Sequence, residues 1–168
     1  MQKILIISDT HSFLDERLFP HIDWCDHIWH AGDWGIVAVS DTLEALKPIQ
    51  GVYGNIDDAT VRQIYPKINH FTCEELNIGM THIAGAPSSY KPDALECFRI
   101  KTPDIFVCGH SHILQVKRDL HRNGMLFINP GAAGTHGFHK VQTAVRLKIE
   151  GKRIFDVEVI EMSRKVKE

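Results

Sequence analysis

The chain has 168 residues, a length that suits one domain with a substantial hydrophobic core. Hydrophobic residues make up 43% and charged residues 24%, which is an ordinary globular composition and argues against disorder. The net charge is −2, and Lys and Arg are scattered, the closest approach to a basic cluster being the tail from Arg164 to Lys167. We therefore expect a single domain over residues 1–168 that does not bind nucleic acid through its phosphate backbone.

The sequence also indicates where the protein works. The apolar stretch before Ser8 has only four residues, too few for a signal peptide, and no run approaches the roughly twenty apolar residues of a membrane span. The four cysteines are widely spaced without a C-x-x-C pair, so a zinc ribbon or a thioredoxin motif is absent. We expect a cytoplasmic protein with reduced cysteines and no membrane partner.

The first half of the chain alternates predicted strands and helices. Continuous apolar runs predict three buried strands, at Lys3–Ser8, His27–Ala31 and Ile49–Tyr53. Helical patterns lie between them, at Leu14–Phe19, where Pro20 would end the helix, and at Val37–Leu46. This alternation predicts a partly parallel sheet with right-handed crossovers.

The second half is mainly antiparallel in character. A hairpin is predicted around Asn77, followed by a loop over residues 84–92 and a helix at Pro92–Ile100. Further strands are expected at Asp104–Cys108, Leu114–Asp119, Met125–Ile128, Gln142–Ile149 and Arg153–Ile160. The whole chain is predicted to be α/β, with a second and mainly antiparallel sheet.

Five of the predicted strands end on residues that can bind a metal ion. In chain order these residues are Asp9 and His11, Asp33, Asn55, His82, and His110 with His112. Ligands gather beyond the carboxyl ends of strands in open α/β sheets, so we expect these side chains to meet at one point. Buried charges are costly unless a counter-charge or cation offsets them. One or two divalent cations would do so.

The individual motifs differ in strength. Gly54-Asn55 alone is better explained as a simple turn, whereas Gly109-His110-Ser111-His112 after a buried strand is an unusual way to build one. The ordered set resembles the calcineurin-like metallophosphoesterase superfamily, whose pattern is D-x-H, G-D, G-N-H-[DE], a lone histidine and G-H-x-H. The short length and Asn129-Pro130-Gly131 look like the small bacterial and archaeal phosphodiesterases of that superfamily. The resemblance covers Ile4 to Ala144.

The resemblance implies a fold and a ligand set. The fold would be a four-layer αββα sandwich of two mixed β-sheets flanked by helices, forming a single metallophosphoesterase domain. One ion would be held by Asp9, His11, Asp33 and His112, and the other by Asp33, Asn55, His82 and His110. Asp33 would bridge the two ions, and Asp33, Asn55 and His82 are the expected catalytic residues.

The charges then predict the mechanism. Two cations roughly 3.5–4 Å apart lower the pKa of a shared water from near 16 toward 7, so a metal-bridging hydroxide can attack phosphorus in line. We expect a metal-dependent phosphodiesterase with a small-molecule diester as its substrate. The cofactors would be two divalent metal ions, with Mn²⁺ preferred and Ni²⁺, Zn²⁺, Fe²⁺ and Co²⁺ compatible with the same ligands. The natural substrate and the oligomeric state stay open, a homodimer being one option.

Two positions depart from the superfamily pattern. Ile56 stands where a histidine is thought to protonate the leaving group, so poor leaving groups such as alkoxides should react slowly. Asp57 could replace that acid, although its neighbour Asp58 favours a solvated turn. His82 is followed by Ile83 rather than by the usual Gly and His.

Two other functions are compatible with this fold. A noncatalytic protein-interaction scaffold can be built on it, as in the retromer subunit with its degraded metal site. A nuclease of the same superfamily is the second, but it would need a basic surface that this chain lacks. Among the other polar residues, His30 is expected to fix the neighbouring loop, and His136 or His139 could contact the substrate phosphate. Asn129 either belongs to a rigid turn or is directed toward the site.

Overall fold

The computed structural model describes residues 1–163, and the basic tail from Arg164 to Lys167 lies outside them. Two five-stranded mixed sheets form its centre. The first sheet has the order β12 (Arg153–Ser163), β11 (Val141–Glu150), β1 (Gln2–Ile7), β2 (His27–His30) and β3 (Ile49–Gly51). Strands β1, β2 and β3 are parallel, and β11 and β12 extend the sheet in antiparallel fashion.

The second sheet also has a three-stranded parallel part, but with one antiparallel strand at each edge. Its order is β4 (Ile68–Cys73), β5 (Leu76–Thr81), β8 (Ile105–Val107), β10 (Met125–Asn129) and β9 (Gln115–Asp119). Strands β5, β8 and β10 are parallel, while both edge strands run antiparallel to their neighbours. Each sheet therefore has a three-stranded parallel part that offers carboxyl ends to a site.

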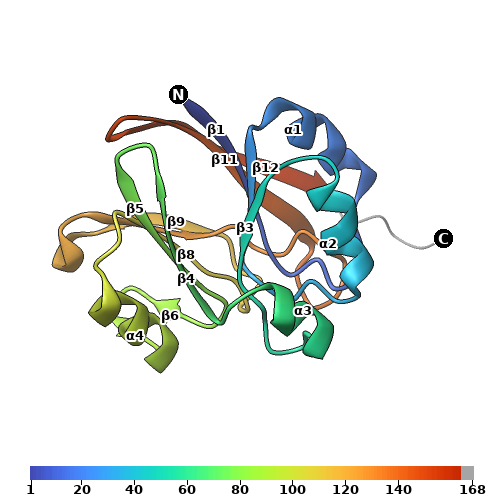
Figure 1. The fold of residues 1–168 in the computed structure, drawn as a ribbon, viewed down its shortest axis with the longest axis horizontal. Coiled ribbons are helices and arrows are strands. Elements are labelled where there is room, and N and C mark those ends of the chain that lie inside the picture. The colour runs from blue at the N-terminus through green and yellow to red at the C-terminus, as the bar shows by residue number, and fades with distance from the viewer. Residues whose placement is uncertain (164–168) are drawn as a thin grey trace.

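Helices cover the outer faces of the sheets (Figure 1). Helices α1 (Phe19–Trp24) and α2 (Val37–Glu44) lie against the first sheet, and α4 (Pro92–Ile100) lies against the second. Shorter elements complete the chain: η1 (Glu16–Leu18), α3 (Ala59–Ile64), β6 (Gly85–Ala86), β7 (Ser89–Tyr90) and η2 (Leu120–Arg122). The predicted four-layer αββα sandwich is confirmed.

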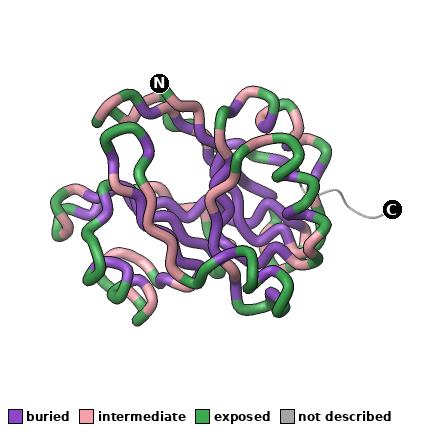
Figure 2. The backbone as a smooth tube through the Cα atoms, in the orientation of Figure 1, coloured by how far each residue is buried: buried purple, intermediate pink, exposed green. Residues whose placement is uncertain are grey.

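Alternating side chains divide the interior into three apolar layers. In β1, Ile4 and Ile6 face the second sheet, while Leu5 and Ile7 face α1 and α2. In β8, Phe106 packs toward α4, and its neighbours in the strand join the layer between the sheets. The buried residues accordingly concentrate in the strands (Figure 2). Burial on both faces explains the continuous apolar runs, because neither face of these strands needs polar residues.

Two predicted boundaries are wrong. Pro20 does not end a helix but lies in the first turn of α1, where the missing proline N–H would have no helical partner in any case. The β4–β5 hairpin turns at Glu74 and Glu75 rather than at Asn77, with Glu74 in the left-handed region at φ 53°. Asn77 instead donates its backbone N–H to Asp104 within the sheet edge.

The sequence also left α3 unpredicted. Asp58 caps this short helix, its side chain accepting the N–H groups of Thr60 and Val61. Six helical residues give too weak a periodicity to recognise without the cap.

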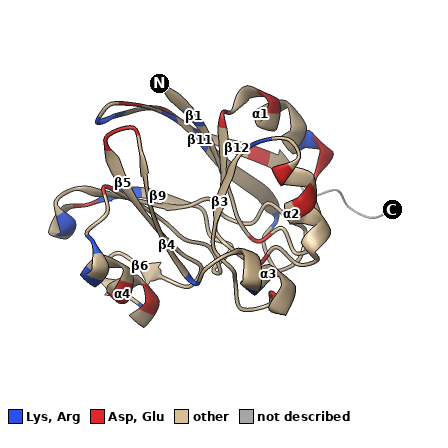
Figure 3. Ribbon diagram, in the orientation of Figure 1, with Lys and Arg blue, Asp and Glu red and all other residues tan. Residues whose placement is uncertain are grey.

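The distribution of charged residues and the burial of the cysteines agree with the expectations from the sequence. Lys and Arg are spread over several elements among Asp and Glu in the described part of the chain (Figure 3). All four cysteines are free and buried, as expected of reduced structural cysteines. Within residues 1–163, none of the helices is both long and apolar enough to span a lipid bilayer.

Candidate metal centre

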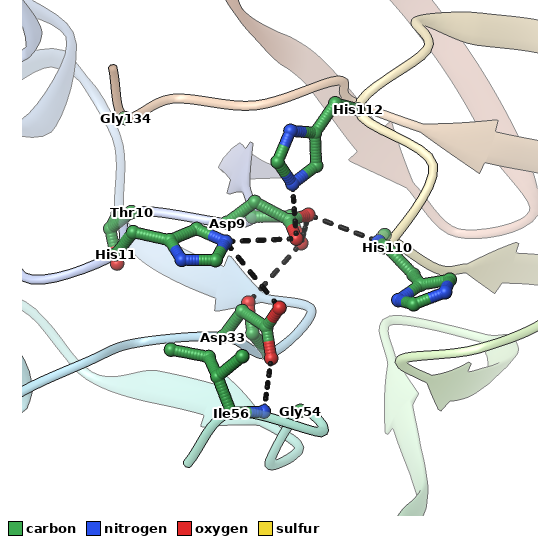
Figure 4. Close-up of polar contacts among 12 residues, drawn as sticks. Asp9, Thr10, His11, Asp33, Gly54, Ile56, His110, His112 and Gly134 are labelled. Atoms are coloured by element: carbon green, nitrogen blue, oxygen red, sulfur yellow. Dashed lines mark hydrogen bonds and ion pairs between the residues drawn. The ribbon is translucent and has the colours of Figure 1, made fainter. Parts of the chain in front are cut away.

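The carboxyl ends of five parallel strands bring the predicted ligands together. The loop after β1 carries Asp9 and His11, and those after β2 and β3 carry Asp33 and Asn55. On the second sheet, His82 follows β5, and His110 and His112 follow β8. Figure 4 shows Asp9, His11, Asp33, His110 and His112 around one point, where side chains from both sheets face one another. His82 and Asn55 join them, because Nε2 of His82 lies 3.2 Å from Oδ2 of Asp33 and 3.0 Å from Oδ1 of Asn55.

The seven residues form two adjoining groups. The inner group consists of Asp9, His11 and His112, and the outer group of Asp33, Asn55, His82 and His110. Ligand atoms of the inner group lie within 4.8 Å of one another, as do those of Asp33, His82 and His110. Asp33 joins the groups, because its Oδ2 is 3.4 Å from Nε2 of His11 and 3.2 Å from Nε2 of His82.

Hydrogen bonds orient the two carboxylates. Oδ2 of Asp9 accepts the Ser8 hydroxyl at 2.6 Å and the backbone N–H of His110 at 3.1 Å. Oδ1 of Asp33 accepts the backbone N–H of Ile56 at 3.1 Å. Each carboxylate thus has one oxygen held by the protein, while the other is directed at the histidines.

Two atoms of the inner group show that the residues fit a cation. Asp9 Oδ1 and His11 Nε2 are buried and have no hydrogen-bond partner, although Oδ1 lies 3.2 Å from Nε2 of His112. Leaving buried polar atoms unsatisfied costs about 1–3 kcal/mol each. A divalent cation between them would remove this cost, and carboxylate oxygen with imidazole nitrogen is a donor set that such ions accept.

In the outer group, His82 is oriented by the main chain. Its Nδ1 lies 2.7 Å from the carbonyl oxygen of Ala31, so this nitrogen donates and leaves the lone pair on Nε2. That Nε2 is 3.0 Å from Oδ1 of Asn55, which is also 3.0 Å from Nδ1 of His110. Two imidazole nitrogens and an amide oxygen directed at a shared point are ligands that a divalent metal ion accepts.

The electrostatics of the site favour positive charge. Burial raises the pKa of Asp9, but contacts with His11 and His112 outweigh it and hold the pKa well below its usual range. Burial lowers the pKa of His82, yet the carboxylates of Asp33 and Asp9 raise it above its usual value overall. The Asp9 carboxylate therefore stays ionised and attracts protons or cations.

The backbone at the site is strained. Five of the seven residues have left-handed backbone conformations, with φ of 53° at Asp9, 45° at His11, 57° at Asp33, 71° at His110 and 60° at His112. Such conformations cost non-glycine residues about 1 kcal/mol or more each and cluster at functional sites. Sharp turns of this kind let Asp9 and His11, two residues apart, face the same point.

Glycines in the motifs allow close approach of the loops. A Cβ on Gly54 would lie 2.0 Å from Oδ1 of Asp33, and one on Gly109 would lie 2.6 Å from Oδ2 of Asp9. The Gly-Asn and Gly-His pairs of the sequence therefore have a steric reason: each glycine passes directly against a carboxylate that would otherwise be displaced.

The supporting role of Asp57 was not predicted by the sequence analysis. Asp57 is buried and accepts the backbone N–H groups of Asp33, Gly35 and Gly54, at 3.0, 3.0 and 2.7 Å. The interpretation of Asp57 as part of a solvated turn is therefore wrong, because its carboxylate ties the Asp33 loop to the Asn55 loop. In the sequence, only its position directly after Ile56, within the third motif, could have indicated that Asp57 supports the site.

The alternatives for Asn129 and His30 now have structural answers. Asn129 donates to the carbonyl of Gly109 and to the hydroxyl of Ser111, so it holds the loop that carries His110. His30 is fully buried, accepts the N–H of Gly32 on Nδ1 and contacts the Thr10 hydroxyl through Nε2. As predicted, His30 fixes the neighbouring loop.

The candidate centre opens into a cavity of about 610 Å³. Ile56 lines it at the position of the missing acid, and His136 and His139 lie on its rim. The ring of His136 stacks on His11 with centroids 4.6 Å apart, while His139 contacts the ring of His112 edge to face. The cavity gives a substrate access to the ligand cluster.

The αββα sandwich and its cluster of ligand-type residues define the class of this protein. It is an α/β protein with a candidate metal centre at the carboxyl ends of its strands. Residues 2–152 match the calcineurin-like phosphoesterase superfamily domain, so the chain belongs to that superfamily. A protein named "Probable metallophosphoesterase" from Methanothermobacter thermautotrophicus is 28% identical over 160 residues, covering 92% of this chain and 90% of that protein.

Solved structures show the same fold. Vps29 of Entamoeba histolytica, solved in complex with Zn²⁺, superposes with a TM-score of 0.72 at 19% identity, covering 96% of this chain and 98% of Vps29. A Thermotoga maritima protein has a TM-score of 0.73 at 25% identity, covering 96% of this chain and all of that one (100%).

Proposed function

We propose that the protein is a metal-dependent phosphodiesterase that uses two divalent cations. The observation that carries this proposal is the position of Asp33, whose Oδ2 contacts histidines of both the inner and the outer group. A carboxylate shared between two sets of ligands is what a two-metal hydrolase requires.

Each group would hold one ion. The inner ion would be bound by Asp9, His11, Asp33 and His112, and the outer ion by Asp33, Asn55, His82 and His110. Such cations, when bound, lower the pKa of water and stabilise negative charge on a phosphate. Mn²⁺ is the preferred candidate, and the mixed imidazole, carboxylate and amide set also suits Ni²⁺, Zn²⁺, Fe²⁺ and Co²⁺.

The residues of the chain set the charge of this site. Only Asp9 and Asp33 bring negative charge, since the amide of Asn55 and imidazole ligands are neutral. Two carboxylates offset half the charge of two divalent cations, so the loaded centre stays positive and attracts an anionic diester. The hydrogen bonds on Asp9 Oδ2 and Asp33 Oδ1 keep the opposite oxygens directed at the ions.

Ile56 limits the range of leaving groups. Its side chain carries no proton, and Asp57 cannot replace it, because that buried carboxylate is held by three backbone N–H groups. Without a general acid, which contributes about 10²–10⁴-fold, alkoxides should leave slowly and nitrophenolates measurably. Comparable turnover of alkyl and aryl diesters would refute this.

A metal titration tests the function. Chelated protein should be inactive on bis(p-nitrophenyl) phosphate and should gain activity with Mn²⁺, while Asp33→Ala should remain inactive. Asp41→Ala, at an exposed position in α2, is the matched control and should behave as wild type. A protein-interaction scaffold, the alternative, would gain no hydrolysis with any of these metals.

The remaining expectations complete the proposal. We propose one domain over residues 1–168, a small-molecule diester as the substrate and a cytoplasmic location, which the four buried free cysteines support.

A further inference from the structure

Three large apolar side chains line the cavity above the candidate centre. Ile56, Ile113 and Phe138 are 47%, 67% and 104% exposed, and all three belong to the lining of the same cavity as the ligands. Leaving such side chains in water is unfavourable, and an apolar surface beside a polar site commonly binds a ligand.

Hydrogen bonds hold the main chain at two of these apolar residues close to the ligands. The N–H of Ile56 is bound to Asp33, and Ile113 directly follows His112, donating its own N–H to Ser111. The backbone positions of Ile56 and Ile113 are therefore fixed relative to the ligands.

The segment that carries Phe138, residues 136–139, also packs against the candidate ligands His11 and His112. Gly137 has φ 118°, and a Cβ there would lie 2.5 Å from Nδ1 of His112, so only glycine permits this approach. On either side of it, His136 stacks on His11, and Nε2 of His139 donates to the carbonyl of Gly134 at 2.7 Å. Phe138 is thus presented at the cavity by a segment built against the candidate centre.

The lining also indicates which chemical group would fit. Among the described lining residues, Asp33 is the only Asp, Glu, Lys or Arg, so the wall offers no lysine or arginine for a second phosphate. Aromatic rings pack favourably on one another and on aliphatic side chains. An aromatic group attached to the phosphate would cover this surface.

We propose that Ile113 and Phe138 bind an aromatic ester group of the substrate, the one retained on the phosphate after hydrolysis, whereas Ile56 lies at the position beside the leaving group. This inference rests on the proposed phosphodiesterase function and adds a specificity determinant to it. A diester with a small alkyl group in the same place would leave the wall exposed to water.

Two diesters with the same leaving group isolate this contact. Phenyl p-nitrophenyl phosphate and methyl p-nitrophenyl phosphate both release p-nitrophenolate, so their chemistry is alike and only the retained group differs. The Mn²⁺-loaded wild type should show a KM about tenfold lower for the phenyl ester, the range expected for burying an apolar group. Phe138→Ala should remove most of this preference, and Phe138→Tyr should retain it.

A binding measurement separates this inference from the proposed function. Calorimetry should show phenylphosphonate binding about tenfold more tightly than methylphosphonate to the wild type, and this ratio should fall in Phe138→Ala. Leu120→Ala, 83% exposed and outside this cavity, is the matched control and should retain the ratio. Equal binding of the two phosphonates, or a ratio unchanged in Phe138→Ala, would overturn the inference. Failure to hydrolyse either diester would instead overturn the phosphodiesterase function.

Discussion

The inner and outer groups of the candidate centre meet at Asp33 but satisfy their polar atoms differently. In the inner group, Asp9 Oδ1 and His11 Nε2 are buried without hydrogen-bond partners. In the outer group, Asn55 lies within hydrogen-bonding distance of both His82 and His110, and His110 is exposed. The inner group therefore depends on a cation more strongly than the outer group does, because two of its buried polar atoms lack a hydrogen-bond partner.

This difference predicts two unequal binding events. An ion in the inner group would satisfy buried polar atoms that lack hydrogen-bond partners, so it should bind tightly and stabilise the fold. An ion in the outer group would bind with a smaller gain in free energy and would exchange more readily with ions in solution. The four predictions below test this comparison, from the largest expected effect to the smallest.

The largest effect is expected from removing a single histidine of either group. His112→Ala should weaken the binding of Mn²⁺ at the inner group and lower diester hydrolysis on the order of 10³-fold, because the inner ion would lose one of its four ligands. His110→Ala should weaken only the outer ion, so that a higher Mn²⁺ concentration restores much of the activity. The metal content after desalting measures how tightly each variant retains Mn²⁺, and the activity as a function of Mn²⁺ concentration measures how far added metal restores hydrolysis. Equal effects of the two variants would remove the distinction.

The second prediction concerns His30, which supports the turn of the inner group through Thr10. Burial lowers the pKa of His30 to about 3, against 6.5 in the unfolded chain. Between these values the unfolded state binds the additional proton, so stability is full above pH 6.5 and falls as the pH decreases toward 3. From pH 7 to pH 4.5 this should cost about 3 kcal/mol.

His30→Phe isolates this contribution. Phenylalanine keeps a ring against Trp34, on which His30 stacks with centroids 3.6 Å apart, but it cannot take up a proton. The variant should therefore lose stability less steeply with acid than the wild type in urea titrations with chelator present. Identical pH slopes would show that His30 is protonated in the folded protein.

The third prediction concerns the close approach of the Gly109 loop to Asp9. In Gly109→Ala the added methyl would collide with the Ser8 hydroxyl and with Oδ2 of Asp9, costing about 2 kcal/mol of stability. The inner ion should bind more weakly as well, because Asp9 must move. Gly124→Ala is the control: its Cβ would meet nothing within 4 Å, and it should lose only the strain of its positive φ. Both are measured by urea unfolding and Mn²⁺ calorimetry.

The smallest effect is expected from the backbone strain itself. His110→Gly and His110→Ala both remove the imidazole and keep the N–H that binds Asp9, but only glycine tolerates φ 71° freely. In metal-free protein, the Gly variant should therefore be about 1 kcal/mol more stable than the Ala variant. A more stable Ala variant would mean that this loop relaxes once the ring is removed.

The sequence alone predicted most of the strands and the identity of the clustered residues. Runs such as Ile4–Ile7 are unambiguous because both faces of the strand are buried, and polar residues directly after such runs stand out. Short elements were harder to predict from the sequence. The helix α3 has only six residues and depends on the Asp58 cap, and a proline such as Pro20 can stand either in the first turn of a helix or just after its last turn. These errors did not alter the predicted site, because its residues follow the long apolar runs.

What the sequence by itself determined, then, was the order of apolar runs and ligand-type residues, along with the family that this order resembles. Only the tertiary structure decided that Asp57 is buried, that Asp9 Oδ1 and His11 Nε2 are left without partners, and that Phe138 joins the cavity wall. The physical reason is distance along the chain. Periodicity reports neighbours within a few residues, whereas burial, carboxylate orientation and cavity lining depend on loops from both sheets, such as the contact between Asp9 and the N–H of His110.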